Sequence, residues 1–129
     1  MILLDTHVLI WMAIEPDRLS TKARHAISQA RASSGLAAAT ITLLELARAA
    51  ERRRVLIPGS VEQFVRDSVA YVVLKPMTPE ITALAVRLPA SYPKDPADRV
   101  IAATAIIEGI PLLTSDERIR NSGVVQTIW

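Results

Sequence analysis

Short runs of apolar residues alternate along the chain with longer segments in which apolar positions recur every three or four residues. The short runs favour β-strands, and the longer segments favour amphipathic helices. The expected strands cover residues 2–4, 36–40, 71–74, 112–114 and 124–128. The expected helices are a short one that ends at Glu15 and Pro16, then 20–32, 42–54 and 61–68, one that opens at Thr78, and 98–108. This alternation predicts an α/β fold with a parallel sheet and right-handed crossovers.

Several of the expected helices carry recognisable start signals and faces. Ser20 and Thr78 are typical N-caps, and Pro79 suits the first helical position after Thr78. The segment 42–54 is amphipathic, and its apolar face consists of Leu43, Leu46, Ala47 and Ala50. The segment 98–108 is apolar almost all round, so we expect it to be buried.

Acidic residues stand at four places where an expected strand or loop leads into an expected helix. Asp5 follows the first strand, Glu45 follows the second, and Asp116 follows the strand 112–114. Asp98 opens the apolar helix, and Asp95 lies three residues before it. Strand-to-helix junctions of a parallel sheet all lie at one edge, so these carboxylates are expected to converge. Carboxylates brought together in this way favour a hard cation that prefers oxygen ligands, such as Mg²⁺ or Mn²⁺.

Each acid also has a purely structural interpretation. Thr42 and Glu45 match a capping box, and Asp95 before Pro96 is a good helix N-terminus. Asp5 and Asp116 could each stabilise a helix start through the helix dipole. Capping and metal binding do not exclude each other. The combination favours a metal site, because Ser, Thr or Asn would serve equally well as caps alone.

Two threonines adjoin the acids. Thr6 follows Asp5, and Thr114 lies two residues before Asp116. Their hydroxyls are suited to orient a metal-bound water, or equally to cap a helix.

Composition narrows the possible classes of protein. The chain has 129 residues, which suits one domain over 1–129, and half of them are hydrophobic. It has no cysteine, which excludes a disulfide framework, a thiolate zinc site and a cysteine nucleophile, and a cytoplasmic location fits. The start carries Asp5 and no basic segment, so a signal peptide is not expected. Glu108, Gly109 and Pro111 break the longest apolar stretch, so no membrane span is expected.

The placement of positive charge tells more than its total. The formal net charge is only +2. A basic patch stands at the end of the helix 42–54 and consists of Arg48, Arg52, Arg53 and Arg54. The patch is either a solvated face that suits a helix C-terminus or a track for the phosphates of a polyanion. Trp11 and Trp129 are expected to pack in the protein rather than to stack on bases.

Four motifs together resemble a known family. They are Leu3–His7, Thr42–Ala47, Asp95–Ala103 and Leu113–Asp116, and they span most of the chain in order. The sequence resembles the PIN-domain ribonucleases, and most closely the VapC-type toxins of bacterial toxin–antitoxin pairs. The resemblance implies a PIN-like three-layer α/β/α sandwich with a short, mainly parallel five-stranded sheet. It also implies Mg²⁺ or Mn²⁺ at the acidic cluster, cleavage of RNA phosphodiester bonds, a homodimer and a cognate antitoxin protein.

The resemblance also implies roles for single residues. The matching catalytic positions are Asp5, Glu45, Asp98 and Asp116. Of these, Asp5, Asp98 and Asp116 are expected to hold the metal, with Asp5 and Asp98 as direct ligands and with Glu45 and Asp116 orienting or deprotonating water. The accessory positions are Thr6, Asp95 and Thr114, and weaker RNA contacts are expected at Arg48, Arg52 and Arg99. Relatives often carry a histidine shortly before the Asp-Pro pair, where this chain has Ser91–Lys94.

Other classes of protein that place acids at strand ends fit less well. A receiver domain requires adjacent acids after the first strand and a lysine after a late strand, and this chain has neither. A phosphatase with an aspartyl nucleophile requires a second acid two residues after the first, where this chain has His7. The alternative from another class is a non-catalytic PIN-fold interaction module. None of the four acids is missing, which favours the enzyme.

Overall fold

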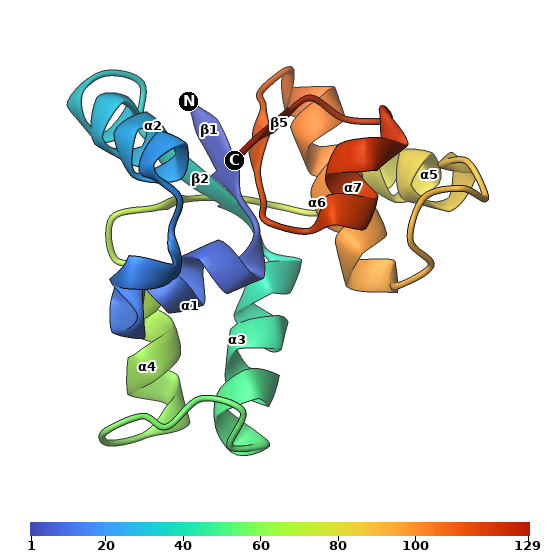
Figure 1. The fold of residues 1–129 in the computed structure, drawn as a ribbon. Helices are drawn as coiled ribbons and strands as arrows, with labels where there is room; N and C mark the ends of the chain where they lie inside the picture. Colours follow the sequence, from blue (N-terminus) through green and yellow to red (C-terminus); the bar gives the residue numbers. More distant parts are fainter.

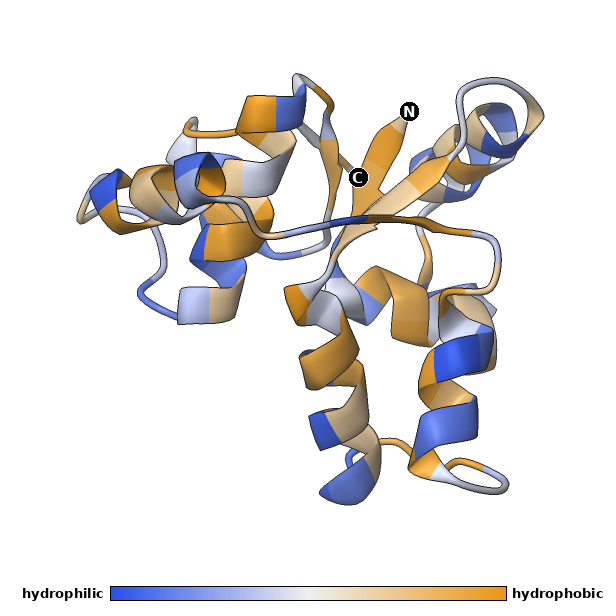
Figure 2. Ribbon diagram, turned by 180° about the vertical axis from the view of Figure 1, so that it is seen from behind, coloured by the Kyte–Doolittle hydropathy of each residue, from blue (hydrophilic) through white to orange (hydrophobic).

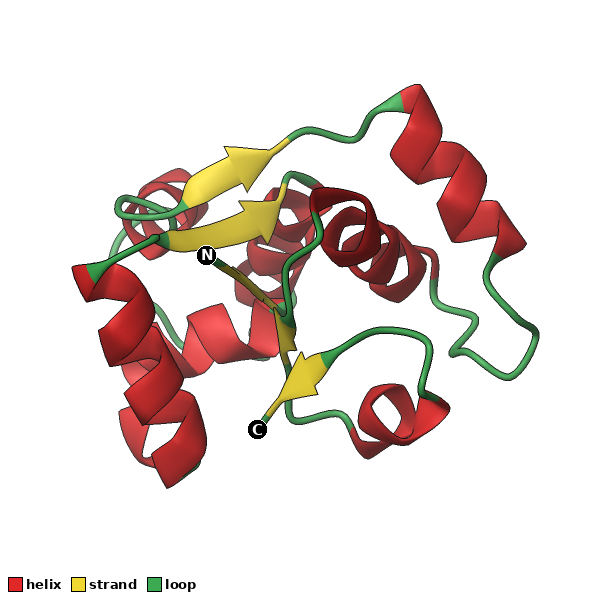
Figure 3. Cartoon of the chain, turned by 90° about the horizontal axis from the view of Figure 1, so that it is seen from above, coloured by secondary structure: helices red, strands yellow, loops and turns green.

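A five-stranded, entirely parallel sheet forms the centre of the molecule in the computed structural model, which describes all 129 residues (Figure 3). Its strand order is β3-β2-β1-β4-β5. The strands are β1 (Ile2–Leu4), β2 (Leu36–Ala39), β3 (Val73–Lys75), β4 (Leu112–Leu113) and β5 (Thr127–Ile128). In the pairing register, Leu3 of β1 lies opposite Ala37 of β2 on one side and opposite Leu112 of β4 on the other. The parallel sheet predicted from the sequence is therefore confirmed.

Seven α-helices and one short 3₁₀ segment connect the strands. They are α1 (Thr6–Ile14), the 3₁₀ turn Pro16–Arg18, α2 (Thr21–Ala32), α3 (Ile41–Glu51), α4 (Val61–Ser68), α5 (Pro79–Arg87), α6 (Pro96–Glu108) and α7 (Glu117–Ser122). The hydroxyls of Ser20 and Thr78 accept hydrogen bonds from backbone amides three residues later, so both predicted N-caps are confirmed. None of the helices combines the length and the apolar run that a bilayer crossing requires.

Alternate residues of the strands face two separate cores, because successive side chains of a strand point to opposite sides of the sheet. Leu4 and Ala38 belong to a core with α1, α2, α3 and α4. Leu3 and Ala37 belong to a second core with α6 and α7. The helix α5 covers α6 through a small cluster of Ile81, Ala85 and Ala103. Figure 1 shows these two groups of helices on either side of the sheet, which gives the expected α/β/α sandwich.

The helix α6 is less buried than its sequence suggests. Its central residues 101–105 are all buried. Ile106 and Ile107 in its last turn remain 38% and 36% exposed. The helix ends at Gly109, which has a φ of +65° and so adopts the left-handed conformation that glycine tolerates best.

The predicted capping box at the start of α3 is wrong. The helix begins at Ile41, and Thr40 at its N-cap makes no side-chain capping bond. Thr42 already lies inside the helix, fully buried, and its hydroxyl lies near that of Thr6 from α1. Thr42 thus contacts Thr6 of α1 instead of capping its own helix. Glu45 takes no part in a capping box.

Candidate active site

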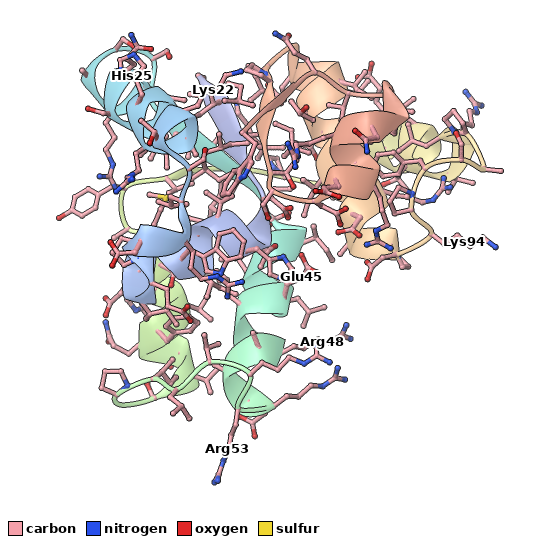
Figure 4. All side chains as sticks on the ribbon, viewed as in Figure 1. Lys22, His25, Glu45, Arg48, Arg53 and Lys94 are labelled. Atoms are coloured by element: carbon pink, nitrogen blue, oxygen red, sulfur yellow. The ribbon has the colours of Figure 1, made fainter.

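The predicted acids lie at the edge of the sheet where the parallel strands end. Asp5 follows β1, and Asp116 follows β4. Glu45 lies in the second turn of α3, near the junction with α1 (Figure 4). Carboxylate oxygens of Glu45, Asp95 and Asp98 lie within 4.8 Å of one another. This edge is where open α/β sheets bind their ligands.

Asp5 is fixed in place by the protein itself. Its side chain is buried, and the residue is only 5% exposed. Its Oδ1 accepts a hydrogen bond of 2.7 Å from the amide of Thr6, and its Oδ2 accepts one of 2.7 Å from Oγ1 of Thr114. Burial raises the pKa of Asp5, and the hydrogen bond from Thr114 opposes that rise. The carboxylate of Asp5 is thus both oriented and partly compensated.

Glu45 is held by a hydroxyl from another helix. Oγ1 of Thr6 donates to Oε1 of Glu45 over 2.5 Å, and it also lies 3.2 Å from Oγ1 of Thr42. Burial raises the pKa of Glu45, and the negative charges of Asp5 and Asp95 raise it further. Thr6 was expected either to orient a metal-bound water or to cap a helix, and in the structure its hydroxyl orients the carboxylate of Glu45. Thr42 is a site residue that the sequence analysis missed, because its pattern matched a cap.

Asp95 and Asp98 open α6, and they differ from each other. Oδ1 of Asp95 accepts from the amides of Ala97 and Asp98 at 2.8 and 3.4 Å, so Asp95 is the predicted N-cap. The carboxylate of Asp98 accepts no hydrogen bond in the structure. Burial raises the pKa of Asp98 to about 7, and repulsion from Asp5, Asp95, Glu45 and Asp116 adds to this effect. Asp98 is therefore the acid whose charge the protein compensates least.

Asp116 is the acid that the protein neutralises most. Its Oδ1 accepts from the amide of Arg118 at 2.9 Å, and its Oδ2 lies 3.0 Å from Nη2 of the same arginine. The side-chain hydrogen bond with Arg118 holds the pKa of Asp116 below its usual value. The amide of Asp116 donates to Oγ1 of Thr114 over 3.1 Å, so Thr114 links Asp116 to Asp5.

The donor set fits a hard divalent cation. It offers carboxylate and hydroxyl oxygens, which Mg²⁺ and Mn²⁺ prefer, and no soft sulfur ligand. Asp5, Asp95 and Asp116 all accept bonds from amides at helix starts, so the capping interpretation is correct for them. Capping explains neither Glu45, which lies inside a helix, nor Asp98, whose carboxylate has no donor. The crowding of uncompensated negative charge around these two residues is what a cation would relieve.

A groove of about 610 Å³ extends from the acids between α1 and α3. Thr6, Glu45 and Asp95 line its acidic end. Its other walls and its far end include His7, Ile10, Trp11, Arg18, Leu44, Arg48, Arg52 and Arg54. The far end of α3 is mostly hydrophilic, whereas β1 and β2 are hydrophobic (Figure 2). The arginines predicted at 48 and 52 thus share one groove with the acids.

Arg99, which was predicted to contact RNA, makes structural hydrogen bonds within the protein. Its guanidinium donates to the carbonyl oxygens of Ala85, Leu88, Pro89 and Tyr92 at 3.0 to 3.4 Å. These carbonyls lie at the end of α5 and in the loop after it, where helix carbonyls lack partners within the helix. Arg99 does not line the groove. Arg99 therefore anchors α6 to α5, and its contact with RNA stays a prediction.

Tyr92 is a second residue that the sequence analysis missed. It is 1% exposed, and its hydroxyl donates to the backbone carbonyl of Asp98 over 3.3 Å. Burial raises the pKa of Tyr92, and the nearby charge of Asp98 raises it further. Tyr92 lies within the segment 91–94, where relatives often carry a histidine, and that difference was the available signal.

The fold and the acidic edge together define a class of protein. Residues 2–124 match the sequence profile of the PIN domain, and the chain belongs to the PIN domain family. The chain is 43% identical to Ribonuclease VapC22 from Mycobacterium tuberculosis over 120 residues. The aligned residues cover 93% of this chain and 90% of that protein.

Solved structures share the fold at low sequence identity. The chain resembles VapBC2 from Rickettsia felis bound to a promoter DNA fragment, with a TM-score of 0.75, 16% identity and coverage of 98% of this chain and 97% of that one. It also resembles DNA-bound VapBC from Salmonella typhimurium, with a TM-score of 0.75, 19% identity and coverage of 98% and 95%. A third match is VapC20 from Mycobacterium tuberculosis, a sarcin–ricin loop cleaving toxin, with a TM-score of 0.64, 15% identity and coverage of 100% of both chains.

Proposed function

We propose that this chain is a metal-dependent endoribonuclease of the VapC type, the toxin of a toxin–antitoxin pair. The observation that carries the proposal is the convergence of Glu45, Asp95 and Asp98 within 4.8 Å, beside Asp5 and Asp116, at the carboxyl edge of the sheet. The 43% identity to a ribonuclease over nearly the whole chain supports the same activity. Uncompensated carboxylates are costly in a module that only binds protein, which disfavours the non-catalytic alternative.

The acids divide the work at the site. Asp5 and Asp98 would hold the metal directly, and Asp116 would join them if its carboxylate released Arg118. When bound, Mg²⁺ or Mn²⁺ acidifies a water, polarises the scissile phosphate and offsets charge in the transition state. Glu45 accepts the proton of the attacking water, and Thr6 orients its carboxylate for that step. Thr114 keeps Asp5 in its ligand orientation.

RNA lies along α3 in this proposal. Glu45, Arg48 and Arg52 are spaced by three and four residues, so they share one face of the helix over roughly 10 Å. None of Arg48, Arg52 and Arg54 has a carboxylate partner within ion-pair distance, so their charges are available to phosphates. A scissile phosphate at the acids would leave its neighbouring phosphates near these arginines.

A protein partner completes the proposal. A solved structure of the same fold is a toxin–antitoxin complex from Klebsiella pneumoniae, which supports a cognate antitoxin for this chain. A basic side chain of the antitoxin, most simply an arginine, would neutralise the carboxylates and compete with metal and RNA. A homodimer is part of the same proposal, and light scattering at micromolar concentration should give the mass of two chains.

Cleavage of labelled RNA tests the activity. The purified protein should cut RNA in Mg²⁺ or Mn²⁺ and stop in EDTA. Asp98→Asn should lower the cleavage rate by about 100-fold or more. Loss of a residue that only orients a metal ligand already lowers activity by about 10- to 100-fold, and loss of a direct ligand should lower it at least as much. Asp67→Asn is the matched control, since this exposed acid lies on α4 and its carboxylate accepts a hydrogen bond only from Gln63. Wild-type rates in both Asp5→Asn and Asp98→Asn would refute the site.

A further inference from the structure

The groove beside the acids has two unlike walls. On the α1 side it is lined by His7, Ile10 and Trp11, which recur on one face of that helix. On the α3 side it carries the cationic Arg48 and Arg52. A single strand of RNA also has two unlike sides, one of bases and one of phosphates. Phosphates on the α3 wall would therefore turn the bases toward the α1 wall.

Arg18 lies over the indole of Trp11 on the α1 side. Its guanidinium carbon is 4.4 Å from the centre of the ring. Trp11 is itself braced by neighbouring rings, with His7 at 6.1 Å and Trp129 at 5.8 Å between centroids. The side chain of Arg18 remains 57% exposed. One side of its guanidinium therefore rests on Trp11, and much of the rest is open to the groove.

We propose that Arg18, held over Trp11, is a stacking platform for a nucleobase of the RNA, one or a few nucleotides from the cut. This inference rests on the proposed ribonuclease function and assigns a subsite to it. Guanidinium planes and aromatic rings are the two kinds of surface on which proteins stack unpaired bases. The groove, at about 610 Å³, lies within the size range of sites that enclose a small molecule.

Charge pairing explains why Arg18 receives a base rather than a phosphate. Arg18 has a carboxylate nearby, Oε2 of Glu15 at 3.7 Å. Arg48, Arg52 and Arg54 line the same groove without such a partner, so phosphates are drawn to them first. The cation of Arg18 is partly balanced, and what it offers is its flat surface.

An abasic scan tests the platform. We would measure the affinity of the non-cleaving Asp98→Asn protein for a mixed-sequence single-stranded RNA of about ten nucleotides, with one base removed at each position in turn. Removal of one base near the cut should weaken binding by about 5- to 150-fold, the range of one base–aromatic stack. In a protein that also carries Trp11→Leu, removal of the same base should weaken RNA binding by no more than about twofold, because the stacking contact is already lost.

Three variants separate stacking from packing and charge. Arg18→Lys keeps the positive charge and the exposed position but loses the planar guanidinium. It should therefore also abolish the loss of affinity on base removal, while leaving the salt dependence of binding unchanged. Trp11→Phe keeps an aromatic ring and should retain most of the penalty. Tyr71→Leu removes an aromatic residue that is 89% exposed outside the groove, and it should leave the penalty at its full size.

The possible failures point to different errors. A wild-type protein that cuts RNA, with no base position coupled to Trp11 or Arg18, would overturn the platform and leave the ribonuclease in place. A protein that neither binds nor cuts RNA would refute the proposed function itself. If a Glu-rich peptide, but not RNA, quenched the fluorescence of Trp11 in a Trp129→Phe background, the groove would belong to an acidic protein segment instead.

Discussion

Asp5 and Asp98 lie at the same edge of the sheet, and the protein treats their carboxylates in opposite ways. Asp5 is 5% exposed and accepts hydrogen bonds from Thr6 and Thr114. Asp98 accepts none and is surrounded by other acids, which together with burial brings its pKa to about 7. The carboxylate of Asp5 is oriented by hydrogen bonds without a cation, whereas that of Asp98 is positioned only by the backbone of α6. The site therefore combines a carboxylate that is already oriented, Asp5, with one that is repelled by its neighbours, Asp98. Binding of a cation would relieve this repulsion.

The largest expected effect is a loss of stability with rising pH in the metal-free protein. The pKa of Asp98 is about 7 in the folded protein and near 3.8 when unfolded, so the folded state binds the extra proton between these values. The free energy of unfolding should therefore fall as pH rises from about 4 to 7, by an amount of order 3 kcal/mol once solvent screening of the partly exposed carboxylate is allowed for. The raised pKa values of Asp5 and Glu45 act in the same direction, and the lowered pKa of Asp116 acts in the opposite one.

Thermal unfolding in EDTA across this pH range measures that effect. Asp98→Asn should flatten the fall and should melt no lower than the wild type at neutral pH. A melting temperature that rises with pH throughout this range would contradict the repulsion described for Asp98. A variant that melts clearly lower at neutral pH would show that the acid serves the start of α6 rather than a cation.

Binding of a divalent metal should restore the stability that the protein loses as pH rises. A cation that binds only the folded state stabilises it by about 2.7 kcal/mol at a concentration a hundred times its Kd. Mg²⁺ or Mn²⁺ should thus raise the melting temperature at neutral pH, and the increase should shrink in Asp98→Asn. Na⁺ at equal ionic strength is the control. An equal increase in wild type and variant would mean that the cation binds elsewhere.

The next effect concerns the oriented carboxylate. Thr114→Val keeps the shape of the side chain but removes the hydroxyl that donates to Asp5 and accepts from the amide of Asp116. It should cost about 1–3 kcal/mol of stability, the usual penalty for buried polar groups that lose a partner. Cleavage should fall by about 10- to 100-fold, as for other residues that orient a metal ligand. Denaturant titration and single-turnover cleavage measure the two effects, and Thr104→Val on α6 is a buried control outside the site.

The smallest effect concerns the backbone that aims Asp98. Tyr92→Phe removes the hydrogen bond from the hydroxyl to the carbonyl of Asp98 and should cost about 0.5–1.5 kcal/mol of stability. Cleavage should fall by less than about tenfold, because Asp98 still occupies the first turn of α6. A loss as large as that of Asp98→Asn would show that the hydroxyl of Tyr92 takes part in the chemistry.

The sequence predicted the sheet and the acidic edge because both follow from local periodicity and chain order. It predicted the capping box wrongly, because the bond that Glu45 makes with Thr6 joins residues 39 positions apart and leaves no local trace. The anchoring role of Arg99 could not be predicted for the same reason, since only the tertiary structure turns that guanidinium toward the end of α5. Trp11 was expected to pack, and it does pack against the core, but it also lines the groove. Periodicity tells which face of a helix is apolar, not which neighbour covers it.

The hydrogen bond between Asp5 and Thr114 has a consequence for the timing of activity. These residues are 109 positions apart, at the ends of two strands that pair in the middle of the sheet. A nascent chain on the ribosome cannot assemble its reaction centre until β4 and Thr114 have emerged and β4 has paired with β1. Truncated translation products that stop before residue 112 would therefore lack both β4 and the hydroxyl that orients Asp5, and they should not cleave RNA.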